Sequence, residues 1–159
     1  MKKFKYGKER VTAVIPAHNE ERSIKKVVQS VKKYCNNVLV VMSKKSKDKT
    51  EDIAISLGAK VIVDNGLGKG EGMRCAIDQI DDGVIVFIDA DGSHTAKDIP
   101  KLVVPVIKKR ADMVIASRFL GGSEEFVGDL SKFLRVVFGM GIALVINWRF
   151  KSSISDTQN

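Results

Sequence analysis

Short, continuous apolar runs separated by helix-like segments constrain the fold of this chain more than any other feature. The runs fall at Arg10–Ile15, Asn37–Met42, Lys60–Val63, Val84–Ile88 and Met113–Ala116. Strands that are apolar throughout are buried on both faces, which is typical of a parallel sheet covered by helices. We therefore predict an α/β fold with three layers, a mostly parallel sheet and helices on both of its faces.

The segments between these runs carry the spacing of amphipathic helices. Ile24, Val27, Val28 and Val31 recur at i, i+3, i+4 and i+7. We expect Pro16 to end the first strand and Asn19 to cap the first helix. A later helix is expected to carry Met73, Ala76, Ile77 and Ile80 on one face. The expected helices cover about 20–34, a segment from Ser46 or Asp48 to just before Gly58, a segment after Gly70, 97–108 and 130–148.

The size and charge of the chain narrow its class. Its 159 residues suit one domain, and 44% apolar with 29% charged residues is typical of a globular protein. The net charge of +8 favours anionic partners such as phosphorylated substrates or acidic lipid headgroups. No nucleic-acid partner is expected, because the few aromatic residues lie mostly in apolar segments and form no stacking platform.

The N-terminus and the cysteines indicate a cytoplasmic location. Residues 1–10 have no apolar core, so no signal peptide is expected. Cys35 and Cys75 lack metal-ligand spacing, and free thiols suit a reducing cytosol. The apolar segment Val136–Ile146 has 11 residues, whereas a membrane span needs about 20.

Polar residues gather directly after the apolar runs, where ligands of parallel sheets bind. Asp89 and Asp91 leave the most apolar run two residues apart. Two carboxylates in one turn can face a single Mg²⁺ or Mn²⁺ ion. Phosphate groups of the substrate then complete the coordination of the ion. The alternative is a polar turn in which an aspartate caps the next helix.

Three further positions are candidates for nucleotide contacts. Glu20 and His18 follow Pro16 at a strand-to-helix corner that suits a nucleobase edge, although a capping turn has the same composition. Lys69 lies in a glycine-rich loop and is expected to contact phosphate, although a flexible surface turn fits equally. Arg118 follows the last run with a guanidinium suited to phosphate, although a surface arginine is the plain alternative.

Taken in order, five stretches resemble family 2 glycosyltransferases, in particular the polyprenyl-phosphate (dolichol-phosphate) mannosyl- and glucosyltransferases. The similarity spans nearly the whole chain, and five motifs in register are more specific than any one alone. The stretches are VIPAHNEERSI at 14–24, GLGKGEGMRCAI at 66–77, VFIDADGSHTAKDIPKL at 86–102, DMVIASRFLGG at 112–122 and SDTQN at 155–159.

The resemblance implies a GT-A fold and a metal-dependent, inverting hexosyltransferase. Such an enzyme moves a hexose from a GDP- or UDP-sugar to a polyprenyl phosphate at the cytoplasmic face of a membrane. Asp89 and Asp91 would hold the metal, and Arg118 would approach the donor or acceptor phosphate, so that Asp91 and Arg118 are the implied catalytic residues. The residues implied in nucleotide-sugar binding are Pro16, His18, Glu20, Lys69, Asp89 and Ala90.

Two departures from the family pattern stand out. The family usually has Asp-Asp-Gly-Ser after the second strand, where an acid helps to hold the nucleotide, whereas residues 43–46 here read Ser-Lys-Lys-Ser. The later Asp48 and Thr50 do fit the pattern. Relatives also continue past the point where this sequence ends, with a Gly-Phe-Arg/Lys segment and often membrane helices.

The long apolar helix, at about 129–149, is a candidate contact surface within the single expected domain, 1–159. It is apolar on more than one face, and basic residues flank it: Lys132, Arg135, Arg149 and Lys151. An anionic membrane surface is the first expected partner and a second copy of the chain is the next. A central core helix is the alternative.

Two rival functions remain open on the sequence alone. Residues 89–93, Asp-Ala-Asp-Gly-Ser, resemble the nucleophile motif of haloacid dehalogenase-type phosphatases, but that motif follows the first strand of its domain and here it follows the fourth. A non-catalytic, glycosyltransferase-like binding module is the second rival, favoured by Lys44 and Lys45 and by the early end of the sequence.

Overall fold

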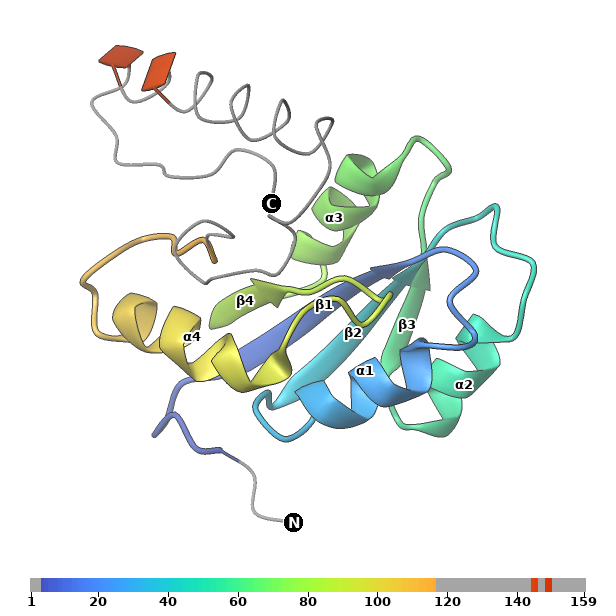
Figure 1. Cartoon of the computed structure of the whole chain (residues 1–159), viewed down its shortest axis with the longest axis horizontal. Helices are drawn as coiled ribbons and strands as arrows, with labels where there is room; N and C mark the ends of the chain where they lie inside the picture. The colour runs from blue at the N-terminus through green and yellow to red at the C-terminus, as the bar shows by residue number, and fades with distance from the viewer. Residues whose placement is uncertain (1–3, 117–143, 146–147, 150–159) are drawn as a thin grey trace, which may run out of the picture. The chain divides into compact units, whose positions relative to one another are not determined.

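The computed structural model describes residues 4–116, 144–145 and 148–149 (Figure 1). The chain divides into two compact units, Met1–Asp112 and Met113–Asn159. The first unit contains the sheet, its covering helices and all the strand ends that carry the candidate site. The expectation of a single domain over 1–159 stays a prediction.

The first unit is built on a parallel sheet of four strands in the order β3-β2-β1-β4. Central β1 pairs with β2 on one side and with β4 on the other, so that Val14 lies level with Leu39 and Phe87. All pairs are parallel, which brings the carboxyl ends of the strands to one edge of the sheet. The strands are β1 (Val11–Ala17), β2 (Asn37–Met42), β3 (Lys60–Val63) and β4 (Val84–Phe87).

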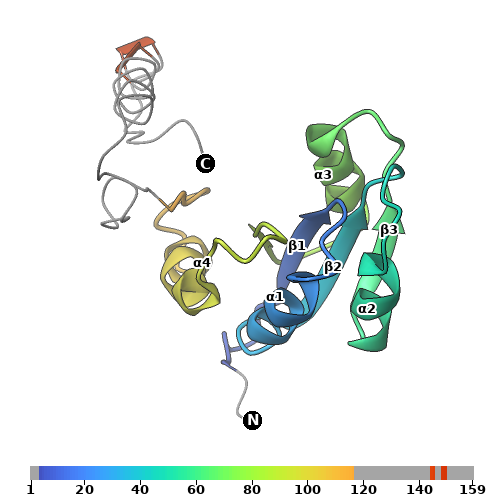
Figure 2. The same ribbon diagram turned by 45° about the vertical axis from the view of Figure 1, so that its right-hand side comes forward.

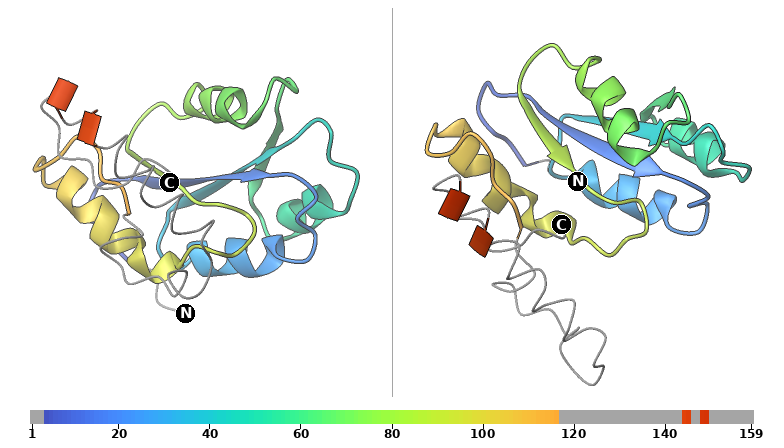
Figure 3. Two further views of the ribbon diagram at one scale, coloured as in Figure 1. Left: turned by 45° about the horizontal axis from the view of Figure 1, so that its top comes forward. Right: turned by 90° about the horizontal axis from the view of Figure 1, so that it is seen from above.

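Helices cover both faces of this sheet, which confirms the predicted three-layer α/β fold. Helices α1, α2 and α4 lie on one face and α3 lies on the other (Figures 2 and 3). The helices are α1 (Ile24–Val31), α2 (Thr50–Ser56), α3 (Lys69–Ile77) and α4 (Ile99–Ile107), with the short 3-10 helix η1 (Ala96–Asp98) leading into α4.

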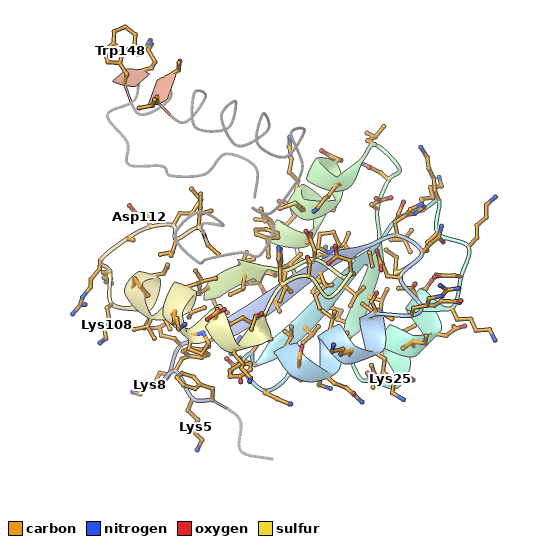
Figure 4. All side chains as sticks on the ribbon, in the orientation of Figure 1. Lys5, Lys8, Lys25, Lys108, Asp112 and Trp148 are labelled. Carbon is orange, nitrogen blue, oxygen red and sulfur yellow. The ribbon has the colours of Figure 1, made fainter. Side chains whose placement is uncertain are left out.

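The core follows from the alternation of side chains along β1. Val11 and Ile15 point to the face covered by α1, whereas Val14 points to the face covered by α3. Helix α1 turns Ile24 and Val28 inward, together with Val27 and Val31, as the i, i+3, i+4, i+7 spacing predicted. Many lysines are exposed, among them Lys5, Lys8, Lys25 and Lys108 (Figure 4).

Two predicted boundaries near the start of the chain are wrong. Pro16 does not end β1 but lies within it, beyond Val14, which is the last β1 residue paired with β4. A missing N–H is tolerated there, because no β4 residue faces it. Asn19 does not cap α1, which begins at Ile24 after Ser23. Its backbone has a φ of 55°, and its side chain bonds a different loop.

Two features further along the chain differ from a simple reading of the apolar pattern. Of the predicted apolar face of α3, Ile77 is 45% exposed, because the helix turns Gly72 and Ala76 toward the sheet. Residues 113–116 do not form a strand, since no strand in the described part of the chain pairs with them. The predicted helix at 129–149 lies largely outside the described residues, of which Leu144, Val145, Trp148 and Arg149 are helical. Within the described residues, no helix has the length and apolarity that a membrane crossing requires.

Candidate functional site

The loops that follow the parallel strands enclose a cavity of about 470 Å³ at the carboxyl edge of the sheet. Its described lining residues all belong to the unit Met1–Asp112, and they come from β1, from β2, from the loops that follow the four strands and from α3. The cavity is lined by Pro16, Ala17, His18, Glu20, Val41, Ser43, Lys45, Asp64, Gly66, Gly68, Lys69, Gly72, Asp89, Ala90 and Asp91.

Asp89 lies after β4 and contacts two basic groups. Its Oδ1 accepts a hydrogen bond of 2.6 Å from Nζ of Lys69, at the start of α3. Its backbone N–H donates to Nδ1 of His94 at 3.2 Å, so that this ring nitrogen is unprotonated. Nε2 of His94 then carries the ring proton and lies 3.9 Å from Oδ2 of Asp89. The His94 ring thus contacts both the backbone and the side chain of Asp89, and it links the two ends of the turn after β4.

Asp91 is held as a carboxylate by the same turn. Its Oδ1 accepts the backbone N–H of Ser93 at 2.9 Å. This bond and the Ser93 hydroxyl lower the pKa of Asp91, partial burial opposes them, and the positive charge of Lys69 lowers the pKa further. Both hydrogen bonds favour the ionised form, which is the form that binds cations.

The two aspartates fit a divalent cation that is bound largely by its substrate. Asp89 and Asp91 present carboxylate oxygens, which Mg²⁺ and Mn²⁺ prefer. Across the part of the chain that the structure describes, no three acidic, histidine or cysteine side chains gather into a complete metal cage. Phosphate oxygens and water would therefore supply the remaining ligands.

The end of β1 contributes Pro16 to the cavity, and the loop after β1 contributes His18 and Glu20. Glu20 is held from two sides, since its backbone N–H donates to Oγ1 of Thr50 at 2.8 Å and its Oε2 accepts from Oγ of Ser23 at 2.7 Å. His18 is exposed. Glu20 is therefore positioned before any ligand binds.

Hydrogen bonds join the loops after β1 and β2, at residues 18–21 and 43–50. Oδ1 of Asn19 accepts from the backbone N–H of Lys47 at 2.9 Å, and Oδ2 of Asp48 accepts from that of Glu21 at 2.9 Å. Partial burial would raise the pKa of Asp48, but hydrogen bonds from Thr50, Glu21 and Ser46 lower it by more. Asp48 therefore joins the two loops as a carboxylate.

Asp64 in the cavity and His94 beside Asp89 were not among the predicted site residues. Asp64 follows β3 as Asp89 follows β4, so the rule on strand ends contained the signal, but a single acid after a short apolar run is a weak pattern. Oδ1 of Asp64 accepts the backbone N–H of both Lys44 and Gly66 at 2.9 Å. His94 lay inside the aspartate motif, but its contact with Asp89 depends on how the turn folds.

The predicted site residues within the described part of the chain all line this one cavity. The structure brings together Pro16, His18, Glu20, Lys69, Asp89, Ala90 and Asp91. Arg118 lies outside the described residues. The roles assigned to these residues from the sequence stay predictions.

A parallel α/β sheet whose strand ends enclose paired carboxylates and a glycine-rich loop defines a class of nucleotide-binding proteins. Comparison with known families makes the class specific. The model of the family "Glycosyl transferase family 2" matches residues 12–155. The chain belongs to this family, which confirms the resemblance and decides against a haloacid dehalogenase-type phosphatase.

Curated relatives include an uncharacterized protein of Methanocaldococcus jannaschii, 38% identical over 74% of this chain and 50% of its own length. A low-salt glycan biosynthesis hexosyltransferase of Haloferax volcanii is 33% identical over 84% of this chain and 36% of its own length. A UDP-N-acetylglucosamine–dolichyl-phosphate N-acetylglucosaminyltransferase of Methanococcus voltae is 29% identical over 70% of this chain and 53% of its own length. The chain thus spans about half of these relatives or less.

Solved structures of glucosyl-3-phosphoglycerate synthase from Mycobacterium tuberculosis resemble the chain. The complex with Mn²⁺, UDP-glucose and phosphoglyceric acid matches with a TM-score of 0.55 and 28% identity, over 63% of this chain and 40% of that one. The complex with Mg²⁺ and UDP matches with a TM-score of 0.56 and 29% identity over the same shares. These similarities confirm the GT-A fold, and the neighbours bind UDP and a divalent cation.

Proposed function

We propose that the chain is the nucleotide-sugar-binding part of a metal-dependent, inverting glycosyltransferase that moves a hexose from a GDP- or UDP-sugar to a polyprenyl phosphate. The observation that carries this proposal is that one strand-end cavity is lined by Asp89, Asp91 and Lys69 together with Glu20. The solved neighbours with UDP-glucose support the donor class, and the relative named for dolichyl phosphate supports the acceptor class.

In this proposal, Asp89 and Asp91 bind Mg²⁺ or Mn²⁺ together with the diphosphate of the donor. The cation, when bound, neutralises charge on the diphosphate as it leaves the sugar. Lys69 adds a second positive charge at the same place, and Ala90 lies against the sugar nucleotide. The nucleoside contacts Pro16, His18 and Glu20. The donor or acceptor phosphate contacts Arg118.

The proposed reaction needs positioning more than proton transfer. A phosphate oxygen of the acceptor bonds to the anomeric carbon while the bond to the diphosphate breaks on the opposite face, which inverts the configuration. Because the acceptor oxygen is already anionic, no strong general base is required. Catalysis then rests on alignment of the two phosphates and on electrostatic stabilisation of the leaving diphosphate.

We also propose that the segment at about 129–149 contacts an anionic membrane surface at the cytoplasmic face, where a polyprenyl phosphate is accessible. Leu144, Val145 and Trp148 are exposed (Trp148 is labelled in Figure 4). Flotation with liposomes of anionic lipid at low salt tests this contact, and liposomes of neutral lipid are the control. Co-flotation with both kinds or with neither contradicts the electrostatic part of the proposal, and a concentration-dependent dimer in solution supports self-association instead.

A non-catalytic binding module is the second candidate. It is favoured by Ser43 and Lys45, which line the cavity where the family usually has Asp-Asp-Gly. Such a module would bind nucleotide sugars without transferring the sugar. Incubation with a nucleotide sugar, Mn²⁺ and a polyprenyl phosphate separates the two candidates, since only the enzyme forms a glycolipid.

Calorimetry with UDP- and GDP-sugars tests the shared step of nucleotide binding. We expect the wild-type protein to bind one of them in Mn²⁺ and to bind it at least about tenfold more weakly without the ion, because the diphosphate must otherwise face two carboxylates. Asp91→Ala should lose the gain from Mn²⁺. Asp98→Ala is the matched control, since the side chain of Asp98 lies outside the cavity and bonds only Lys101 among the described residues. Equal affinity with and without Mn²⁺ in the wild type and in Asp91→Ala would contradict the proposal.

A further inference from the structure

Asp64 lies at the opposite end of the cavity from the paired aspartates Asp89 and Asp91. It follows β3, whereas Asp89 follows β4, and these are the two outer strands of the described sheet. Asp64 is only 9% exposed, yet it lines the cavity. A ligand that reaches from Asp89 to Asp64 must therefore extend across the ends of β1 and β2.

The two oxygens of Asp64 have different surroundings. Oδ1 is fixed by the backbone N–H of Lys44 and of Gly66. Oδ2 has no hydrogen-bond partner among the residues that the structure describes and, unlike Oη of Tyr6, is not a fully buried unpaired atom, so it is open to the cavity. One oxygen thus anchors the side chain, and the other is available to a ligand.

Close packing by α3 holds this side chain in place. A Cβ atom at Gly72 would lie 3.3 Å from Cβ of Asp64, 3.6 Å from its Oδ2 and 3.2 Å from Cγ1 of Val41. The absence of a side chain at Gly72 therefore lets the helix approach both β2 and Asp64. An acceptor that is buried, anchored and confined in this way discriminates more strongly between ligands than a mobile surface group.

The loop after β2 supplies no carboxylate to this end of the cavity. Ser43 and Lys45 are its contributions, and the loop after β3 adds Asp64 with Gly66 and Gly68. Asp64 is therefore the carboxylate that lines the cavity from the β2 and β3 side, within the described residues.

We propose that Oδ2 of Asp64 accepts a hydrogen bond from a ring N–H of the nucleobase and so selects uracil or guanine over cytosine and adenine. This inference rests on the proposed function, which places the diphosphate at Asp89 and Asp91 and so leaves the β3 end of the cavity to the nucleoside. An ionised carboxylate only accepts hydrogen bonds. Uracil N3 and guanine N1 carry a proton, whereas cytosine N3 and adenine N1 present a lone pair that repels the carboxylate.

Asp64→Asn isolates this role because it keeps the shape of the side chain. The amide oxygen can still accept from the backbone N–H of Lys44 and Gly66, while the NH₂ group takes the place of Oδ2 and can only donate. In Mn²⁺ we expect UDP, or GDP if that is the nucleotide bound, to bind about tenfold more weakly or worse, because an N–H of the base then meets another donor. CDP should lose no affinity, so that the preference for UDP over CDP falls by the same factor or more.

Two further measurements separate recognition from structure. Inorganic pyrophosphate in Mn²⁺ should bind wild type and Asp64→Asn equally, since it does not reach Asp64. N3-methyl-UDP should bind the wild-type protein at least about tenfold more weakly than UDP, and N1-methyl-GDP is the corresponding probe if GDP is bound. The methylated nucleotides test the inference even if the variant fails to fold.

The outcomes of these titrations are distinct. If the wild-type protein binds neither nucleotide nor pyrophosphate in Mn²⁺, the proposed function fails and this inference fails with it. If the wild type binds UDP or GDP but the variant keeps the same preference over CDP, or the methylated nucleotide binds equally well, the inference alone is overturned. Loss of pyrophosphate binding in Asp64→Asn would also overturn it, because Asp64 would then support the whole cavity.

Discussion

Nζ of Lys69 lies 2.6 Å from Oδ1 of Asp89, so a cation of the protein occupies a carboxylate oxygen that a metal ion would also use. Both side chains are partly exposed, at 60% and 36%, and water weakens the attraction between them. The pair therefore opens at little cost. Lys69 is placed to move from the aspartate to a phosphate when a metal and a diphosphate arrive together.

Lys69→Met is expected to change two affinities in opposite directions. Mn²⁺ alone should bind about two- to fivefold more tightly, because its competitor at Asp89 is removed. UDP in Mn²⁺ should bind about tenfold more weakly, because a charge-assisted bond to phosphate is lost. Electron paramagnetic resonance of free Mn²⁺ measures the first affinity and calorimetry the second.

Arg10→Met is the control for this pair of measurements. It breaks the exposed ion pair of Arg10 with Asp82, 3.3 Å long, and removes the same charge outside the cavity. Neither affinity should change in this variant. If both affinities fall in Lys69→Met, then Lys69 supports the metal site and does not compete with it.

Ser93→Ala is expected to raise the pKa of Asp91 without restoring it fully. The hydroxyl is lost, but the backbone N–H of residue 93 remains and is the larger cause of the lowered pKa. The value should therefore stay below the ordinary aspartate pKa of about 3.9. Carbon-13 NMR titration of the carboxyl measures it, with Ser56→Ala on α2 as the control, because Ser56 bonds the carbonyl of Ile53. Identical titration of Asp91 in both variants would refute this account.

The same shift predicts a sign for the pH dependence of stability. The pKa of Asp91 is lower in the folded state, so the ionised carboxylate stabilises the fold above the ordinary pKa. That contribution is lost as the pH falls through the folded pKa. Urea denaturation of wild type and Asp91→Asn between about pH 6 and pH 3 measures it: the difference in the free energy of unfolding should shrink as the pH falls.

Thr50→Val is expected to lower the free energy of unfolding by about 1–3 kcal/mol. Oγ1 of the fully buried Thr50 accepts from the backbone N–H of Glu20 at 2.8 Å and donates to Oδ1 of Asp48 at 2.6 Å. Valine has the same shape, but it leaves the backbone N–H of Glu20 and Oδ1 of Asp48 without the hydroxyl of Thr50 as a partner. Thr12→Val is the matched control, because the side chain of Thr12 makes one long bond of 3.5 Å to Asn37. Urea denaturation compares them, and equal losses would remove the special role of Thr50.

Gly83→Ala is expected to destabilise the first unit by about 2 kcal/mol or more, from a left-handed backbone and a clash together. Gly83 has a φ of 96°, and a Cβ there would meet the carbonyl oxygen of Arg10, a backbone atom that cannot move aside. Gly7→Ala is the control, with a φ of 70° and nothing within 4 Å of its added Cβ. Thermal unfolding should show a clearly smaller loss for Gly7→Ala.

The sheet was predictable because apolar runs report burial on both faces. The bounds of β2 and β3 agree residue for residue with the runs Asn37–Met42 and Lys60–Val63. The cavity followed from these strands, since parallel strands place the residues after them at one edge. The run at 113–116 was as apolar, but a strand also needs a neighbour to pair with, and a local pattern does not report that.

The details of the site depend on contacts that local patterns do not contain. Asn19 has the composition of a helix cap, but its side chain binds the N–H of Lys47 on another loop. Asp64 binds the backbone N–H of residue 44 and not its side chain. The loop after β2 therefore keeps its anchor with any amino acid other than proline at position 44, which is why a lysine there is compatible with the fold.

The bonds between the loops after β1 and β2 also limit how this protein can be re-engineered. Asn19 and Glu21 on one loop contact Lys47 and Asp48 on the other, twenty-seven or twenty-eight positions along the chain. If only one of the two loops were replaced by that of a relative, the polar groups of the remaining loop would lose their hydrogen-bond partners. Chimeras that aim at a new donor specificity must therefore transplant residues 18–21 and 43–50 together, as a single cassette.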